Sequence, residues 1–434
     1  MNQPTPSLPP VSGSATPRIL SLDQFRGYTV VGMFLVNYMG SFKEATPRIL
    51  LHTHDYCSYA DTIMPQFLFA VGFSFRLTFG RRAQRDGLGA AFWHMVRRIL
   101  GLMLIAIVVY GSSQPSATWE ALTQMGWWDA LKNVFGTNMK REWYQTLMHI
   151  AFTSLWLLPV IRSSGMVRFA WMLMSAAAHI WLSWWFNFEW VNTGPNGIDG
   201  GPLGFLTWCV PAMFGTFACD AIAGAMGRPR LGRLVVWGAL LMGLAWVMSC
   251  GTRMYDVPAS DVASLEGKKL APDPIFPAWD KVKAHFEQPL EKLIAEPPFV
   301  PPPPAPDQYE KLSKSSESDG TPPPEMYRKW NYWMMSQRGG TLSYPMFSAG
   351  VSLWVYVLFY LACDVLKFRS TFFNAFGVNA LAAYILHGMV GGAVKPLVPE
   401  GAPWWLAWFS LAVFFVINYV IIRHLEKQKI FLKL

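Results

Sequence analysis

The stretch WWLAWFSLAVFFVINYVII, residues 404–422, carries no charged side chain and decides the class of this protein. A helix rises about 1.5 Å per residue, so about 20 apolar residues cross a hydrocarbon core of about 30 Å. LGLMLIAIVVYG, residues 100–111, and ALLMGLAWVMSC, residues 239–250, are apolar runs of the same kind. Because these runs are not amphipathic stripes, they predict an integral membrane protein in contact with a lipid bilayer.

Composition and charge agree with that class. Of the 434 residues, 52% are hydrophobic and 15% are charged, whereas about a quarter of a soluble domain is charged. The net charge of +9 would suit nucleic-acid binding, but the basic residues lie between apolar runs and do not cluster on one helix face. We expect them to anchor membrane helices, with no nucleic-acid partner. The cysteines show neither CxxC nor His-rich spacing, so we expect no metal site.

We predict an all-α polytopic membrane bundle of about ten transmembrane helices with a Pro-rich external insertion. The predicted spans are residues 27–43, 59–79, 95–113, 144–162, 167–187, 204–226, 231–251, 343–366, 371–394 and 402–423. The predicted parts are a disordered cytoplasmic N-terminus without a cleavable signal peptide (1–20), the first seven helices (21–251), a non-cytoplasmic insertion (252–342), and the last three helices with a basic cytoplasmic tail (343–434).

The short loops differ in charge between the two sides of the predicted bundle. If ten spans alternate, about eighteen Lys and Arg side chains fall on one side, against about six in the short loops of the other. GRPRLGR, residues 227–233, is one of the basic loops. The positive-inside rule places the basic side and both termini in the cytoplasm, and we expect the bacterial inner membrane.

The predicted insertion differs from the spans. EPPFVPPPPAP, residues 296–306, and SKSSESDGTPPPE, residues 313–325, are rich in proline and poor in apolar residues. Such sequence favours extended or disordered chain, so we expect the middle of the insertion to be flexible. The aromatic run MYRKWNYWMM, residues 326–335, is expected on the membrane interface, where Trp and Tyr are enriched.

LLHTHDYCSYADTIMPQFLFAVGF, residues 50–73, places titratable groups where the second span begins. His52, His54 and Asp61 are predicted at its non-cytoplasmic mouth. Ionisable groups within a bilayer cost about 2.5–3.5 kcal/mol each, so they normally face the bundle interior and often mark function.

Other polar residues in or beside the spans have structural interpretations as well as functional ones. Arg76 and Asp220 can pair near the cytoplasmic ends, and His149 can be a hydrogen-bonded packing histidine. Asn379 and His387 are candidates for a polar interior or substrate contact, and hydrogen bonds that join helices are the structural alternative.

The N-terminal pattern resembles a known family. RILSLDQFRGYTVVGMFLVNYMGSF, residues 18–42, followed by HTHDYCSYADTIMPQFLFAVGFSFRL, residues 52–77, resembles the first two membrane segments of the heparan-α-glucosaminide N-acetyltransferase family, in its bacterial branch. TGPNGIDGGPLGF, residues 193–205, and FGVNALAAYILH, residues 376–387, are similar to later family elements. The matching N-terminal residues are Ser21, Leu22, Asp23, Phe25, Arg26, Gly27, Val36, Asn37, Ala60, Asp61, Pro65, Phe67, Phe69 and Gly72.

This resemblance implies an acyltransferase that moves an acetyl group from cytosolic acetyl-CoA to an amino sugar, or a cell-envelope glycan, across the membrane. It implies a loop histidine as base or acyl carrier; His52 is preferred to His54 because its spacing before Asp61 is closer to that of the family. Neutral imidazole can take the proton of the attacking amine. Asn37 is expected to hydrogen-bond the acyl carbonyl or its oxyanion, and Asp61 to orient the histidine.

Two residues are expected at the cytoplasmic entrance of the first span. Asp23 and Arg26 are predicted to pair there and to help hold the CoA donor, with a structural clamp as the alternative. Two rival functions stay open: a transporter or flippase, suited to a helix broken near GVNALAAYILHGMVGG, residues 377–392, and a non-catalytic membrane scaffold whose insertion binds a partner. Assembly as a homo-oligomer is left open.

Overall fold

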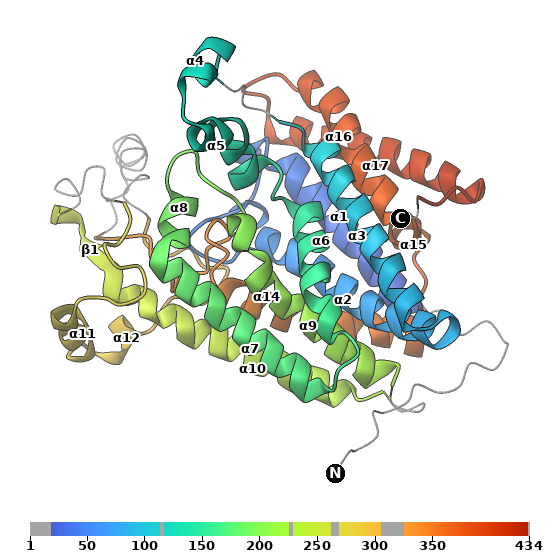
Figure 1. Ribbon diagram of the computed structural model, residues 1–434, viewed down its shortest axis with the longest axis horizontal. Helices are drawn as coiled ribbons and strands as arrows, with labels where there is room; N and C mark the ends of the chain where they lie inside the picture. Colours follow the sequence, from blue (N-terminus) through green and yellow to red (C-terminus); the bar gives the residue numbers. More distant parts are fainter. Residues whose placement is uncertain (1–18, 113–116, 225–228, 262–268, 305–324, 433–434) are drawn as a thin grey trace.

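The computed structural model describes residues 19–112, 117–224, 229–261, 269–304 and 325–432, and these residues form a helical bundle (Figure 1). The predicted disordered terminus, apart from residues 19 and 20, lies outside the described residues, as does the centre of the predicted insertion, residues 305–324. Two short strands, β1 (Asp256–Pro258) and β2 (Met326–Arg328), pair antiparallel, with Val257 opposite Tyr327.

Among the described residues, seven helices are long and apolar enough to cross a membrane, in agreement with the predicted all-α membrane bundle. With their short extensions they cover Tyr59–Asp86, Leu88–Tyr110, Gly201–Ile222, Leu231–Tyr255, Ser343–Val365, Ala380–Leu397 and Trp404–Lys427. The regular helices within them are α2 (Tyr59–Asp86), α3 (Leu88–Tyr110), α9 (Phe205–Ile222), α10 (Leu231–Cys250), α14 (Ser343–Tyr360), α16 (Ala380–Val394) and α17 (Trp404–Lys427).

Further helices lie where the sequence predicts the remaining spans. They are α1 (Leu20–Met39), α6 (Thr146–Leu157), α7 (Gly165–Leu182) and the short α15 (Thr371–Val378). The first predicted span began too late, because α1 includes the charged residues Asp23 and Arg26 in its first two turns. Outside these helices the structure has α4 (Trp119–Gln124), α5 (Trp127–Thr137), α8 (Phe188–Asn192), α11 (Trp279–Phe286) and α12 (Leu290–Leu293).

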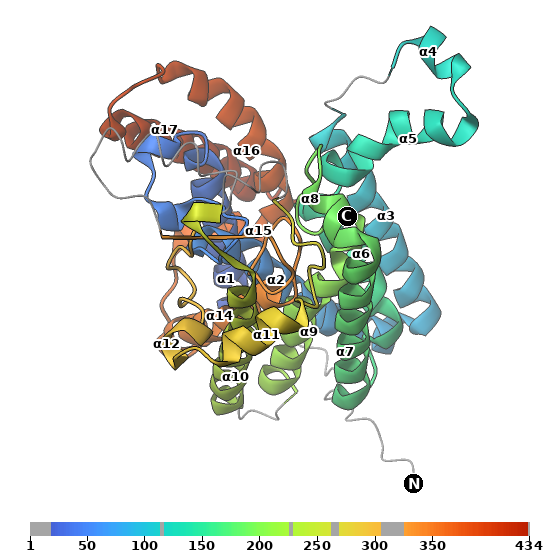
Figure 2. The same cartoon turned by 90° about the vertical axis from the view of Figure 1, so that its left-hand side faces the viewer.

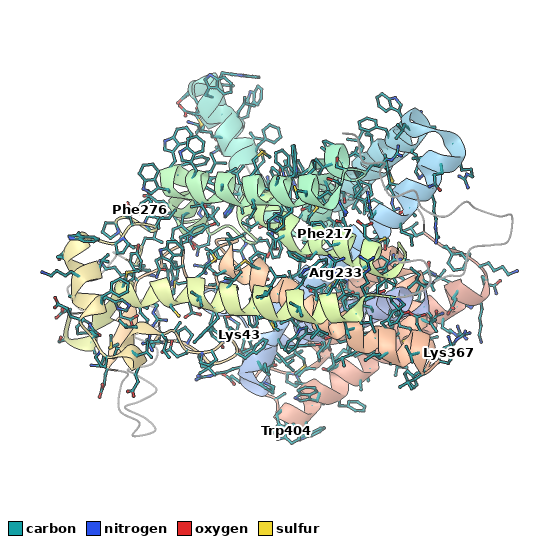
Figure 3. All side chains as sticks on the ribbon, turned by 90° about the horizontal axis from the view of Figure 1, so that it is seen from below. Lys43, Phe217, Arg233, Phe276, Lys367 and Trp404 are labelled. Carbon is teal, nitrogen blue, oxygen red and sulfur yellow. The ribbon has the colours of Figure 1, made fainter. Side chains whose placement is uncertain are left out.

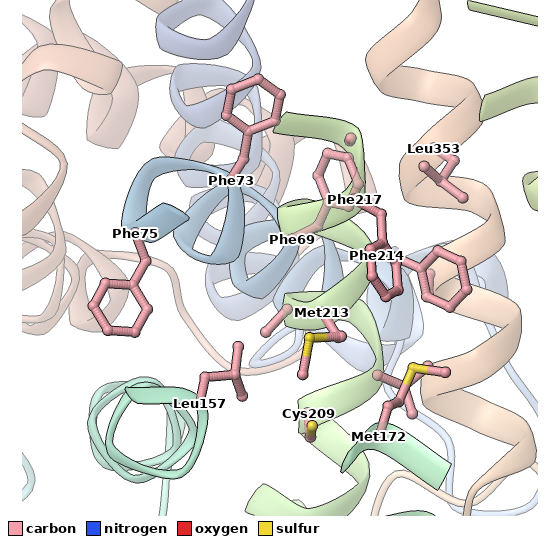
Figure 4. Packing of buried hydrophobic residues seen from close by; sticks show 14 of the residues in the cluster. Phe69, Phe73, Phe75, Leu157, Met172, Cys209, Met213, Phe214, Phe217 and Leu353 are labelled. Carbon is pink, nitrogen blue, oxygen red and sulfur yellow. The ribbon is translucent and has the colours of Figure 1, made fainter. Parts of the chain in front are cut away.

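The core forms where glycines let helix backbones approach closely. A Cβ atom on Gly72 of α2 would lie 1.9 Å from the carbonyl oxygen of Ala212 of α9, and one on Gly215 would lie 2.1 Å from that of Phe69. Around this crossing, large side chains from α2, α6, α7, α9 and α14 fill the interior (Figure 4). Small residues at helix crossings allow the close packing that associates helices in lipid.

The ninth predicted span is broken. The sequence predicts one helix over 371–394, but α15 ends at Val378 and α16 begins at Ala380. Asn379, between them, has φ −111° and ψ +38°, which interrupts the helix. Its side-chain amide donates to the carbonyl of Ile430 at 3.0 Å, so the break lies beside the C-terminal tail.

The expected interfacial position of residues 326–335 is wrong. Tyr327, Asn331 and Tyr332 are at most 1% exposed and pack inside the protein. Arg328 is equally buried and pairs with Asp256 through its Nε atom, at 2.5 Å. Because Trp and Tyr are also at home in a protein core, their enrichment alone could not distinguish a membrane interface from an interior. The C-terminal part of the predicted insertion therefore belongs to the packed body.

Candidate functional site

Four segments that are distant in sequence meet at one end of the bundle, which we call the loop end: residues 43–58, 138–145, 193–204 and 325–342. Arg141 donates to the carbonyl of Asn196 at 3.2 Å, and Gly200 donates its backbone N–H to the carbonyl of Arg338 at 3.0 Å. His52 and His54 belong to the first segment. Their pKa values are shifted by charged groups of the other three segments, namely Asp199, Arg141 and Arg338.

A histidine–aspartate pair lies at the start of α2. The Nδ1 atom of His52 lies 2.9 Å from Oδ1 of Asp61, within hydrogen-bond distance. Asp61 is 1% exposed at its side chain, whereas His52 is 36% exposed. The sequence predicted that Asp61 orients the histidine, and the structure brings these two side chains together. With the proton on Nδ1, the Nε2 atom is left as the basic nitrogen of the neutral ring.

The start of helix α2 fixes the position of Asp61. Ser58 is the N-cap, its hydroxyl accepts from the backbone N–H of Asp61 at 3.3 Å, and its own N–H donates to Oδ2 of Asp61 at 2.9 Å. This reciprocal arrangement is a capping box. The hydroxyl of Thr53 adds a donor to Oδ2 at 3.1 Å, and Tyr344 donates to the Asp61 carbonyl at 2.7 Å. The Ser58 N–H and the Thr53 hydroxyl thus both point at the carboxylate, whereas Tyr344 holds the backbone of the first turn of α2.

The two histidines have opposite electrostatic surroundings. For His52, burial lowers the pKa, but the hydrogen bond and the charge of Asp61, together with Asp199, outweigh it and raise the pKa above its usual value. For His54, burial and then the charge of Arg338 lower the pKa to about 3. His54 is therefore neutral across the physiological range, and the geometry favours His52 as the base.

Asp199 is a second carboxyl group near His52 that the sequence analysis did not single out. It is 3% exposed, and its Oδ1 accepts from Nε2 of Gln337 at 3.1 Å. Burial raises the pKa of Asp199 to about 7, while the charge of His52 opposes the rise. Its backbone carbonyl accepts from the indole of Trp208 at 2.9 Å, which fixes the loop. The run IDGG within residues 193–205 was the only signal for it in the sequence.

The structure does not join Asn37 to the histidine pair. Asn37 is exposed near the end of α1, and its backbone carbonyl accepts from Nζ of Lys395 at 3.2 Å. Within the described ranges its side chain has no hydrogen-bond partner. Its expected role at the acyl carbonyl therefore stays a prediction.

Asp23 and Arg26 pair at the other end of α1, as the sequence predicts. Nη1 of Arg26 lies 3.9 Å from Oδ1 of Asp23. A further carboxylate is close, because the backbone N–H of Ser21 donates to Asp364 at 3.3 Å. Since the guanidinium of Arg26 already faces Asp23, and a second carboxylate holds the start of the same helix, these contacts suit a structural clamp better than a site for the phosphates of CoA.

The remaining candidates take part in packing. His387 donates through Nδ1 to the carbonyl of Tyr384, and its ring stacks on Phe34 with centroids 5.0 Å apart. Asn379 binds the tail at Ile430. These contacts fit the structural alternative for both residues and do not form a polar interior at the centre of the bundle.

The pairing predicted for Arg76 and Asp220 is confirmed, whereas His149 is buried by packing alone. Asp220 of α9 pairs with Arg76 of α2 at 3.0 Å and with Arg168 of α7. His149 is fully buried, and its ring centroid lies 6.1 Å from that of Trp208. Among the described residues neither ring nitrogen has a hydrogen-bond partner, so the packing role is seen without the expected hydrogen bond.

No protein-family model and no curated protein matches this chain. Among the described residues, no group of three or more His, Cys, Asp or Glu side chains could hold a metal ion. The expected absence of a metal stays a prediction.

Proposed function

We propose that this protein is a membrane-embedded acyltransferase with His52 as its base. The observation that carries the proposal is the His52–Asp61 pair, in which a buried carboxylate holds Nδ1 and the ring is 36% exposed. This arrangement recurs in enzymes that transfer acyl groups, where the carboxylate orients the imidazole and stabilises the imidazolium. The resemblance to the heparan-α-glucosaminide N-acetyltransferase family suggests acetyl-CoA as donor and an amino sugar or glycan as acceptor.

In the proposed reaction, His52 takes up one proton and later releases it. The acceptor amine attacks the thioester carbonyl, a C–N bond forms, and Nε2 of His52 takes the amine proton. The C–S bond then breaks and the proton passes from the imidazolium to the thiolate of CoA. Asp61 and the nearby Asp199 both favour the charged imidazolium, because each raises the pKa of His52. A route through an acyl-histidine uses the same nitrogen as nucleophile.

We further propose ten crossings, with the loop end outside the cell. In the described part of the chain, the hydrogen bonds between distant loops join segments predicted on the same side, and these contacts support this count. Lys395, in a predicted outer loop, donates to the hydroxyl of Ser41 at 2.8 Å, at the outer end of the first predicted span. On the predicted inner side, Gln24 contacts the carbonyl of Ser370 at 3.0 Å. Figure 3 shows the same separation, with Phe276 and Lys367 at opposite ends of the long axis.

The CoA donor is part of this proposal, and no residue described above is assigned to its phosphates. The thioester must reach Nε2 of His52 at the loop end, so the acetyl group has to pass along the bundle from the predicted cytoplasmic side. Bound CoA would supply the activated acetyl group, and the residues of this chain would orient the acceptor and move its proton.

The test is acetyl transfer by the purified full-length protein in liposomes. With labelled acetyl-CoA and glucosamine, His52→Ala should lower transfer by about 10²–10⁴-fold, the usual contribution of a general base. His54→Ala is the matched control and should keep transfer within a few-fold of the wild type. Transfer that survives in His52→Ala would contradict the assignment of the base.

The rival transporter and scaffold functions give different results in the same experiment. A transporter moves sugar without consuming the acyl donor, and a scaffold does neither. The transporter was favoured by a helix broken at the centre of the membrane, but the break at Asn379 lies beside the tail at Ile430. This position removes the specific observation that favoured transport.

A further inference from the structure

Two short helices at the loop end project from the body of the bundle. α4 and α5 extend beyond the end of α3, away from the remaining helices (Figures 1 and 2). Their tryptophans are among the most exposed in the described structure: Trp119 is 80% exposed, and Trp127 and Trp128 are each 73% exposed. Exposed aromatic side chains gathered on one element mark an interaction surface.

α5 has one apolar and one polar face. Its apolar residues recur at helical spacing at positions 127, 128, 131, 134 and 135. The polar face is already engaged: Lys132 lies 3.4 Å from Asp129, and Asn133 accepts from the backbone N–H of Ala117 at 2.8 Å. An amphipathic helix of this kind needs an apolar medium or partner along one side.

The surface of the neighbouring helix α3 indicates that lipid is the apolar medium for α5. α3, which leads into them, exposes Leu104 at 65% and Val108 at 81%, as a lipid-facing membrane helix does. In the chain, α4 lies between this lipid-facing helix and α5. Trp is enriched where bilayer and water meet, because its ring is apolar and its N–H is polar.

We propose that α4 and α5 lie in the bilayer surface at the loop end, with the apolar face of α5 at the boundary between lipid headgroups and acyl chains. The charges of Asp129 and Lys132 cancel on α5, and α4 carries only the acidic Glu120, so the two helices offer no net positive charge to anionic lipid and the attraction is apolar. The partner is therefore a zwitterionic lipid surface such as phosphocholine. This inference does not depend on the proposed acyl transfer.

The position of these helices bears on the candidate site. α5 leads into residues 138–142, where Lys140 donates to the carbonyl of Thr193 at 2.8 Å and Arg141 to that of Asn196 at 3.2 Å. Both carbonyls belong to the segment that carries Asp199. Binding of α5 to the lipid surface would therefore hold the segment that carries Asp199 close to the membrane surface.

The test uses the full-length protein in phosphocholine liposomes with an environment-sensitive fluorophore on a single cysteine. Trp128→Cys and Phe135→Cys place it on the apolar face, and Lys132→Cys is the matched control on the polar face. Cys250→Ser provides the background, because the other native cysteines are buried. A phospholipid with a spin label high on its acyl chain should quench the two apolar positions at least about two-fold more than position 132.

High salt should leave the difference in lipid quenching between the apolar positions and position 132 unchanged. Equal quenching at positions 128, 132 and 135 would overturn the proposal, as would stronger quenching of position 128 by aqueous iodide than by the lipid. Energy transfer between labels on different copies, without lipid quenching, would show that a second copy of the chain covers this face, and it would also overturn the proposal. Using two apolar positions keeps the test valid if one variant fails to fold.

Discussion

At the scale of single residues, the carboxylate of Asp61 belongs both to a helix start and to the candidate site. It closes the capping box with Ser58 and also holds Nδ1 of His52. A capping residue contributes about 1 kcal/mol to stability. Because the cap forms whenever α2 folds, folding itself sets the orientation of the imidazole. Preorganisation of this kind keeps a base aligned without a further cost during the reaction.

The first prediction concerns the pH dependence of transfer. The base must be unprotonated, and the pKa of His52 is raised, so the rate should rise with pH through a midpoint above the ordinary histidine value of about 6.5. Asp61→Asn removes the main interaction that raises the pKa of His52 and leaves burial, which lowers that pKa. Its midpoint should move to lower pH, while the maximal rate falls by about 10²–10⁴-fold. Initial rates between pH 5 and 9 measure both effects.

Loss of rate with an unchanged midpoint would show that Asp61 acts only as a cap. Ser58→Ala is the control for this alternative, because it weakens the capping box without removing the carboxylate. It should lower stability by about 1 kcal/mol and leave the midpoint near that of the wild type.

The second prediction concerns stability and His54. Its folded-state pKa, about 3, lies below the unfolded value of 6.5. A histidine whose pKa is lowered by folding contributes its full stabilisation above pH 6.5. This contribution is lost as the pH falls toward 3, because the unfolded chain then binds a proton that the folded protein does not. His54→Gln should therefore reduce the drop in melting temperature between pH 7 and pH 4. The exposed His424→Gln is the control, and equal drops in all three proteins would contradict the prediction.

The residues of the site that lie close together in sequence could be predicted from the sequence. His52 and Asp61 lie nine positions apart, so their spacing before an apolar helix was visible. Asp199 and Gln337 were not, because their hydrogen bond joins segments 138 positions apart. Only the packing of the helices brings such groups together, and neither composition nor periodicity records it.

At the scale of helices, the bundle depends on glycines at crossings. The third prediction is that Gly72→Ala destabilises the protein, since its Cβ would lie 1.9 Å from a backbone carbonyl oxygen that cannot move aside alone. We expect a cost of about 1–3 kcal/mol or more from overpacking. Gly243→Ala in α10 is the control, because no atom lies within 4 Å of the added carbon. Thermal unfolding in detergent compares the two, and equal melting temperatures would contradict the prediction.

Periodicity and hydropathy identified the helices better than their ends. A run such as residues 404–422 can satisfy its backbone in lipid only as a helix, and α17 covers Trp404–Lys427. The start of α1 was missed because charged residues lower hydropathy, although they can pair at a helix end. The break at Asn379 depends on a contact with Ile430 that sequence does not show.

At the scale of the whole molecule, the described loops that contact one another lie on the same predicted side. At the loop end, the segments around His52, Arg141, Asp199 and Arg338 meet, although between one and three pairs of predicted spans separate them in sequence. At the opposite end, Asn374 donates to Glu426 at 3.0 Å. Such segregation follows if every helix or broken helix crosses the membrane once, and it agrees with the charge difference between the loops.

The last prediction tests this arrangement with a membrane-impermeant maleimide on single cysteines in a Cys250→Ser background. Phe276→Cys, 64% exposed at the loop end, should be labelled in intact cells. Lys367→Cys and Lys429→Cys, both exposed at the opposite end, should be labelled only after the membrane is opened. Positions 276 and 367 flank the single helix α14, while positions 367 and 429 flank the pair formed by α15–α16 and α17. Labelling of position 429 but not position 367 in intact cells would mean that only one of α15–α16 and α17 crosses, which would place the tail on the same side as His52 and leave an odd number of crossings.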